Sequence, residues 1–187
     1  MDERRRQILL TIAIILFISS LLIPFVVVFL LQDLFFTDRS QWFFITPTTA
    51  YITFMAGMMW PAIVIFIHLL IQTKYNFKSY KWVSIALIPL SIPVLLFGLT
   101  NYYYFDDQGI NYNHLTTTNQ MTYEWDGFKE VEKIYSKEDG TTTLVEYRFL
   151  TKKDEEIFVP VNMDFRNYQS RILKYLEENK VKVIDSI

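Results

Sequence analysis

The sequence predicts a membrane α-helical anchor of three transmembrane helices, followed by a small α+β domain in which an antiparallel sheet is capped by one C-terminal helix. Two observations support this fold class. Three long apolar runs lie within residues 8–101, whereas most of the Asp, Glu, Lys and Arg residues follow Asp106. From Tyr102 onward the hydrophobic pattern also changes from helical to alternating, which is typical of strands. We therefore expect an anchor over residues 1–101 and a domain over residues 102–187.

The composition excludes several classes of protein. With 187 residues, of which 51% are hydrophobic and 20% charged, the chain is too apolar for an ordinary globular protein. The formal net charge is -2, and the basic residues do not cluster without acids nearby, so nothing indicates nucleic-acid binding. Cysteine is absent, which excludes disulfides, thiolate catalysis and zinc–thiolate sites.

The first transmembrane helix is predicted at about residues 8–31. This charge-free run exceeds the roughly 20 residues needed to cross the hydrocarbon core. It is too long for the apolar region of a signal peptide and is followed by no cleavage site, so we expect a retained helix. After the first loop, Trp42, Phe43 and Phe44 are expected to form an aromatic belt where the chain re-enters the membrane.

The second transmembrane helix is predicted at about residues 45–72. Gly57 and Pro61 inside it indicate a kink or a close helix contact. His68 is the only acidic or basic side chain in the three apolar runs, and one interpretation is a proton relay. We favour a structural histidine, near the interface or hydrogen-bonded to a backbone carbonyl, because no acidic partner lies in the other runs.

The third transmembrane helix is predicted at about residues 82–101. Pro89 and Pro93 flank Ser91 there, which predicts a bent helix in which the serine hydroxyl satisfies a freed carbonyl.

The distribution of basic residues predicts the orientation of the helices. Arg4, Arg5 and Arg6 precede the first helix, three lysines lie in the second loop, and Asp106 and Asp107 follow the third helix. Because basic flanks stay on the cytoplasmic side, we expect a multi-pass protein of the cell membrane. Its N-terminus would be cytoplasmic and its C-terminal domain extracytoplasmic.

The polar half is predicted to contain about five antiparallel strands and one helix. Gly109 lies in a predicted hairpin turn, and Pro160 indicates that its strand is at an edge or an end of the sheet. The strands are expected in YYYF with INYNHL, MTYEW, FKEVEKIYS, TTTLVEYRFL and IFVPV. The helix is expected at about residues 163–179, with Asn162 or Asp164 as its N-terminal cap and Asn179 as a left-handed terminator.

Three stretches of this domain resemble bacterial pleckstrin-homology-like (PH-like) domains attached to short transmembrane hairpins or bundles in Gram-positive bacteria. They are YYYFDDQGINYN, YEWDGFKEVEKI and LVEYRFLTKKDEEIFVPV, followed by the final helix. The sequence departs from that family because the sheet is shorter than the usual seven strands, and because Gly127 replaces an aliphatic residue. The resemblance implies a small curved sheet capped by a helix, used for binding or scaffolding and without catalytic residues.

Trp125 is the first candidate for a functional site. It can be interpreted as an anchor that binds a partner or as a core residue under the final helix. We favour the core residue because large aromatic side chains dominate small cores. Three consecutive tyrosines are expected both at the headgroup level of the membrane and in the first strand. They are Tyr102, Tyr103 and Tyr104.

A metal site was considered at the polar residues of the first hairpin. Oxygen ligands cluster there, but their spacing fits no EF-hand loop, and a hairpin turn requires the same residue types. These residues are Asp106, Asp107, Asn111 and Asn113. His114 has no nucleophile motif beside it, so we expect a solvated histidine. The prediction is therefore a protein with no metal, no cofactor and no enzymatic activity.

The leading functional hypothesis is a non-enzymatic integral membrane protein whose PH-like domain binds or scaffolds a protein partner at the membrane surface. The alternative is an accessory or immunity-type membrane protein that acts through its helices on a toxin, an exporter or a channel. The expected partners are the lipid bilayer and a protein, with no nucleic acid, and homo-oligomerisation is left open.

Overall fold

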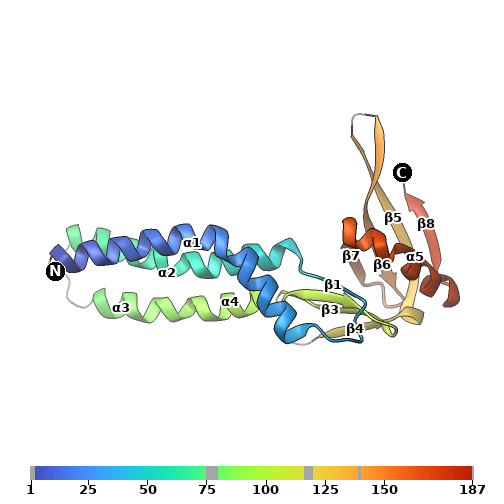
Figure 1. Cartoon of the computed structure of the whole chain (residues 1–187), viewed down its shortest axis with the longest axis horizontal. Helices are drawn as coiled ribbons and strands as arrows, with labels where there is room; N and C mark the ends of the chain where they lie inside the picture. Colours follow the sequence, from blue (N-terminus) through green and yellow to red (C-terminus); the bar gives the residue numbers. More distant parts are fainter. Residues whose placement is uncertain (1–2, 75–79, 116–119, 139, 187) are drawn as a thin grey trace. The chain divides into compact units, whose positions relative to one another are not determined.

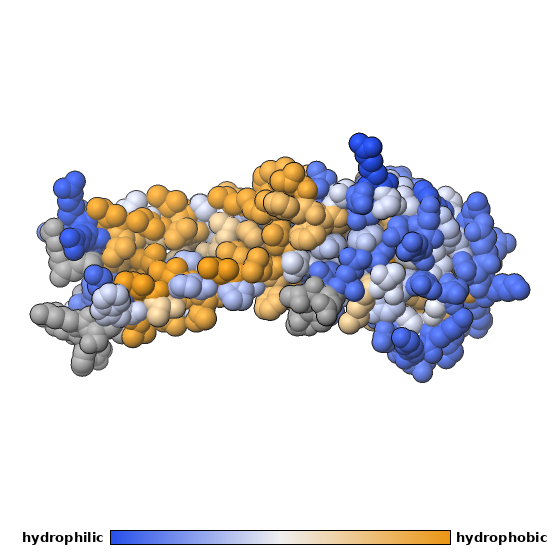
Figure 2. Space-filling view, turned by 90° about the horizontal axis from the view of Figure 1, so that it is seen from below, coloured by the Kyte–Doolittle hydropathy of each residue, from blue (hydrophilic) through white to orange (hydrophobic). Residues whose placement is uncertain are grey.

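The computed structural model describes residues 3–74, 80–115, 120–138 and 140–186. The chain forms two compact units, which we call the helical unit and the sheet unit. The helical unit comprises Met1–Thr37, Ile45–Tyr102 and Asn113–Gln120, and the sheet unit comprises Asp38–Phe44, Tyr103–Tyr112 and Met121–Ile187. The sheet unit therefore includes part of the first loop, which the sequence analysis placed with the anchor. Figure 2 shows a mainly hydrophobic surface over the helices and a mainly hydrophilic one over the C-terminal strands.

Three helices among the described residues are long and apolar enough to cross a membrane. They are α1 (Glu3–Phe36), α2 (Thr48–Lys74) and a divided third helix, which consists of α3 (Tyr80–Leu87), the 3-10 turn η1 (Ile88–Leu90) and α4 (Ser91–Thr100) (Figure 1). The helix α1 extends beyond the predicted residues 8–31 at both ends. The helix α2 begins later than predicted because the residues before it form a strand.

The core of the helical unit lies between α1, α2 and α4. Val28 and Ala50 are fully buried there, beside Phe54. Two glycines make close approach possible: a Cβ atom on Gly57 would lie 2.8 Å from Leu95 Cδ2, and one on Gly98 would lie 2.7 Å from the Phe54 nitrogen. The predicted close helix contact at Gly57 is therefore confirmed.

The third helix changes its winding at Ile88–Leu90, as its prolines predict. Pro89 lies in the 3-10 turn and lacks the N–H that a regular helix would use. The hydroxyl of Ser91 donates a hydrogen bond of 2.8 Å to the carbonyl of Ile88. The same carbonyl also accepts a hydrogen bond from the backbone N–H of Ser91, so the serine side chain bonds a backbone carbonyl in this turn but not one that a proline leaves free.

A buried polar cluster, which we call the Gln32 cluster, joins three segments of the helical unit. The side-chain amide of Gln32 donates to the carbonyls of Leu99 (2.9 Å) and Asn101 (3.0 Å), and its oxygen accepts from the Thr46 hydroxyl at 2.5 Å. Gln32 is fully buried. The cluster therefore ties the end of α1 to the start of α2 and to the end of α4.

The first sheet contains four strands in the order β1-β2-β3-β4. These are β1 (Phe43–Ile45), β2 (Tyr102–Phe105), β3 (Gly109–Asn113) and β4 (Met121–Glu124). The turn between β2 and β3 is held by the Asp106 carboxylate, which accepts from the N–H groups of Gln108 and Gly109 and from the side chain of Asn111. Part of the segment predicted to form an aromatic belt supplies strand β1, and its place at a membrane surface stays a prediction.

The second sheet contains four strands in the order β7-β6-β5-β8. These are β5 (Phe128–Glu138), β6 (Thr141–Thr151), β7 (Glu156–Pro160) and β8 (Lys182–Ser186). The prediction of one antiparallel sheet ending in a helix is wrong in two respects, because there are two sheets and because β8 pairs with β5 in parallel. The physical reason is that the alternating segment after the helix has strand propensity and covers the free edge of β5.

The amphipathic helix α5 (Met163–Glu178) follows β7. The side chain of Asn162 caps it by accepting a hydrogen bond of 2.7 Å from the N–H of Phe165, as predicted. Its apolar stripe buries Phe165, Ile172 and Leu176. The left-handed residue after the helix is Lys180, with φ of 56°, and not Asn179, so that prediction is wrong.

Candidate functional site

Trp125 lies in the core of the sheet unit. It begins the short turn η2 (Trp125–Gly127) between β4 and β5, and only 3% of its surface is exposed. Its indole N–H donates to the carbonyl of Asp106 at 3.1 Å, and its backbone N–H donates to the carbonyl of Gln108 at 3.2 Å. The turn after β2 therefore holds this tryptophan in place.

Three aromatic rings from distant parts of the sequence stack at Trp125. The ring of Tyr175 on α5 lies 5.3 Å from that of Trp125, at an interplanar angle of 9°. The ring of Trp42, from the first loop, lies 6.4 Å from Trp125 and 6.3 Å from Tyr175, nearly parallel to both. The guanidinium of Arg171 lies 4.7 Å from the centre of the Trp42 ring, in the geometry of a cation–π contact. We call these four residues the Trp125 cluster.

Asp107 connects the Trp125 cluster to the turn after β2. Its Oδ1 atom accepts hydrogen bonds from the hydroxyl of Tyr175 at 2.7 Å and from Nη2 of Arg171 at 2.8 Å. The bond from Tyr175, followed by the bond and the charge of Arg171, holds the pKa of Asp107 below its ordinary value. The same carboxylate raises the pKa of the Tyr175 hydroxyl. Asp107 therefore works as an ionised acceptor that fixes α5 against the turn.

An acidic hollow of about 570 Å³ opens beside the cluster. Trp125 and Tyr175 form part of its wall, and four carboxylates line it, from Asp107, Glu124, Asp126 and Glu178. Within the described residues, no group of three or more His, Asp or Glu side chains could hold a metal ion.

A second hollow, of about 630 Å³, lies along strand β4, and we call it the edge groove. Its walls are β4 (Met121–Glu124), Asp126 with Gly127, and the turn between β6 and β7, which carries Lys152, Lys153 and Glu155. The N–H of Lys152 donates to the carbonyl of Gly127 at 2.9 Å and fixes this turn beside η2. Acidic and basic side chains therefore face the same open groove.

Strand β4 is the last strand of its sheet in the described part of the chain. The backbone N–H of Trp125 donates to the carbonyl of Gln108. Hydrogen-bonded and non-hydrogen-bonded pairs alternate along an antiparallel ladder, so Tyr123 and Met121 also exchange backbone hydrogen bonds with their partners on β3. Thr122 and Glu124 then direct their backbone N–H and C=O groups away from β3. The edge groove thus runs along a strand edge whose outward backbone groups, within the described residues, face away from the sheet.

The three tyrosines form most of β2, as the sequence predicts. Tyr102 and Tyr103 are buried, and Tyr104 is partly exposed. Burial raises the pKa of Tyr103, and in the described residues its hydroxyl has no hydrogen-bond partner. Their expected place at the membrane surface stays a prediction.

His68 lies on α2, and its side chain contacts α3 in the helical unit. It is buried, and its Nδ1 atom lies 2.8 Å from the hydroxyl of Ser84. One polar partner of this histidine is thus a serine side chain on the third helix.

Sequence reasoning missed that Trp42 and Arg171 belong to the Trp125 cluster and that Asp107 bonds to it. These three residues lie on the first loop, a helix and a turn, and no short-range pattern links them. The aromatic run at Trp42–Phe44 was the available signal, because it has strand propensity as well as the character of a membrane belt.

The chain was compared with protein families, with curated proteins and with solved structures, and no match was found in any of the three.

Proposed function

We propose that this chain is a non-enzymatic, multi-pass protein of the cell membrane whose sheet unit binds a protein partner at the membrane surface. The observation that supports this proposal is the edge groove. There the backbone groups of Thr122 and Glu124 point away from β3, where a further strand could pair with them. Strand addition is a recurring mode of peptide recognition, in which backbone bonds give affinity and pockets for alternate side chains give specificity. The occupant is an extended segment of the partner that pairs with β4.

The arrangement of strands supports a PH-like identity for the sheet unit. In the described residues, seven strands precede α5, and the four of the first sheet are followed by β5, β6 and β7 of the second. The first loop supplies the strand that the sequence analysis did not count. A rigid sheet with a helix packed by aromatic rings suits a binding module, since its open edge is held in a fixed conformation.

Photo-crosslinking in native membranes tests this proposal. A photoreactive residue at Lys153, in the edge groove, is expected to crosslink to one protein, whereas the same residue at Lys174, exposed on α5, is expected not to. Thr122→Pro removes an outward N–H and should abolish the crosslink. Thr122→Lys, a milder change that places a charge at the edge, should weaken it.

Tryptophan fluorescence of each variant reports whether the sheet unit is folded. A crosslink at Lys153 that persists in folded Thr122→Pro and Thr122→Lys variants would contradict strand addition. An identical set of crosslinks from Lys153 and Lys174 would contradict a specific site in the edge groove.

A further inference from the structure

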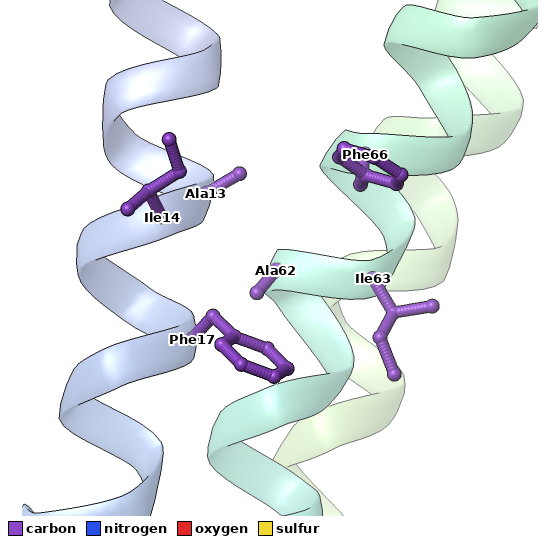
Figure 3. Close-up of a pocket in the computed structure, with 6 residues that line it drawn as sticks. All are labelled: Ala13, Ile14, Phe17, Ala62, Ile63 and Phe66. Atoms are coloured by element: carbon purple, nitrogen blue, oxygen red, sulfur yellow. The ribbon is translucent and has the colours of Figure 1, made fainter.

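The helical unit has an apolar groove of about 320 Å³ between α1 and α2 (Figure 3). Six residues line it: Ala13, Ile14, Phe17, Ala62, Ile63 and Phe66. Figure 3 shows Ala13 and Phe17 pointing from α1, and Ala62 from α2, toward the space between the two helices. The alanines are buried, with 4% and 3% of their surfaces exposed, whereas the larger side chains are about half exposed. The groove therefore has a floor of small side chains and open walls.

The chemistry of the groove restricts its occupant to hydrocarbon. None of the six lining side chains carries a polar atom. A peptide or a polar metabolite would leave unpaired hydrogen-bonding groups there, at a cost of several kcal/mol per group. Water is disfavoured for the same reason, because it needs polar partners.

The length and spacing of the groove favour an acyl chain over a transmembrane helix. A helix is about 10–12 Å wide and packs closely where small residues recur every four positions. Four residues after Ala13 and Ala62 come Phe17 and Phe66, so the small floor ends within about one turn on each helix. A single hydrocarbon chain is narrow enough to lie between the phenylalanines.

The basic residues at the start of α1 indicate which class of lipid the groove binds. Arg6 lies seven residues before Ala13 on α1, hence on the same face of the helix and about 10 Å nearer its start. Arg4 and Arg5 are exposed beside it. Basic residues at the end of a membrane-spanning helix attract anionic lipid headgroups. We infer that the groove between α1 and α2 binds one acyl chain of an anionic phospholipid, whose headgroup contacts Arg4–Arg6. This inference rests on the proposed insertion of the helices in a membrane and is independent of partner binding.

A photoreactive lipid tests the site on the unmodified protein. The full chain is reconstituted in vesicles of equal parts phosphatidylglycerol and phosphatidylcholine, with a trace of phosphatidylglycerol that carries a diazirine in its acyl chain. After illumination, labels are expected to concentrate on residues 13–17 and 62–66. Labels spread evenly over all three helices would show surrounding lipid only and would overturn the site.

Substitutions provide a second, independent test of the lipid site. Ala13→Leu or Ala62→Leu fills the floor and removes contact with roughly two methylene groups, which lowers labelling about tenfold. Ala86→Leu makes the same change at an exposed position of α3 and should leave labelling unchanged. Replacing Arg4, Arg5 and Arg6 by glutamine should abolish the preference for phosphatidylglycerol over phosphatidylcholine. Equal labelling of every variant would overturn the proposal.

Flotation of the vesicles separates failure of insertion from failure of the lipid site. A chain that floats with the vesicles but shows no concentrated label contradicts only the lipid site. A chain that does not float contradicts the membrane insertion on which both proposals depend.

Discussion

Single polar side chains fix the packing of each unit. Gln32 uses both ends of its amide inside the helical unit, and Asp107 accepts two hydrogen bonds in the sheet unit. A buried amide or a carboxylate stabilises the fold only when its partners are placed to meet it. These residues therefore specify one arrangement of their neighbours.

Gln32→Leu should lower the free energy of unfolding of the helical unit by about 1–3 kcal/mol, because the hydroxyl of Thr46 and two carbonyls lose a buried partner. Unfolding of the purified protein in detergent micelles, followed by circular dichroism, measures the change. Gln72→Leu is the matched control, since the side-chain oxygen of Gln72 has no partner among the described residues. Equal destabilisation by the two variants would contradict the role of the Gln32 cluster.

Trp125→Ala should cost roughly 3–5 kcal/mol, the range for removing a large aromatic side chain from a core. Trp125 is 3% exposed and stacks on Tyr175. The sheet unit should then unfold at a lower denaturant concentration, as monitored by the fluorescence of the remaining tryptophans. Trp82→Ala removes the same side chain where it is 71% exposed and should change little. A folded, fully stable Trp125→Ala protein would contradict the core role.

The bonds to Asp107 make the stability of the sheet unit depend on acid pH. Its pKa is lower in the folded chain than the ordinary 3.8, so the stabilisation is present above about pH 4 and is lost as the pH falls through the folded pKa. Asp107→Asn should remove this part of the pH dependence of the unfolding midpoint between pH 7 and pH 2. Asp126→Asn, in the same acidic hollow, makes neither bond and should retain it. Identical pH profiles for the wild type and Asp107→Asn would refute the assignment.

Elements that depend on local pattern were predictable, and those that depend on distant pairing were not. The three apolar helices, strands β2 to β7 and the cap of α5 follow from hydrophobic period and turn chemistry. Strand β1 did not, because three aromatic residues after a membrane loop are typical of an interfacial belt as well as of a strand. Strand β8 was missed because the short alternating segment at the end of the chain does not indicate which strand it pairs with. In the structure it pairs in parallel with β5.

Strand β1 and Trp42 make the first loop necessary for the sheet unit. The N–H of Trp42 bonds to the carbonyl of Phe105 at 3.1 Å, and Phe43 packs on Phe105 and Phe165. A fragment of residues 102–187 alone should therefore give broad, non-cooperative unfolding. A fragment in which residues 38–44 are joined through a flexible linker should unfold cooperatively. Equal cooperativity in both fragments, measured by circular dichroism against urea, would contradict this requirement.

At the scale of the whole molecule, the contribution of the first loop constrains how the chain crosses a membrane. The sheet unit draws on the loop between α1 and α2 and on the chain after the third helix. Those two parts lie on the same side of a membrane only if the chain crosses it an even number of times between them. The two helices α2 and α3–α4 meet this condition if both cross, so the composition of the sheet unit is compatible with three spans.

Single cysteines can measure this topology, since the natural chain has none to give a background signal. Ser40→Cys, in the first loop, and Glu178→Cys, on α5, should react from one side of the membrane with a maleimide that cannot cross it. Lys81→Cys, at the start of the third apolar run, should react from the other side only. The basic flanks predict that Ser40 and Glu178 lie outside the cytoplasm, and on that prediction intact cells should label these two and spare Lys81. Labelling of Ser40 and Glu178 from opposite sides would exclude three spans, whereas labelling of both from the cytoplasm would preserve the spans and reverse the orientation.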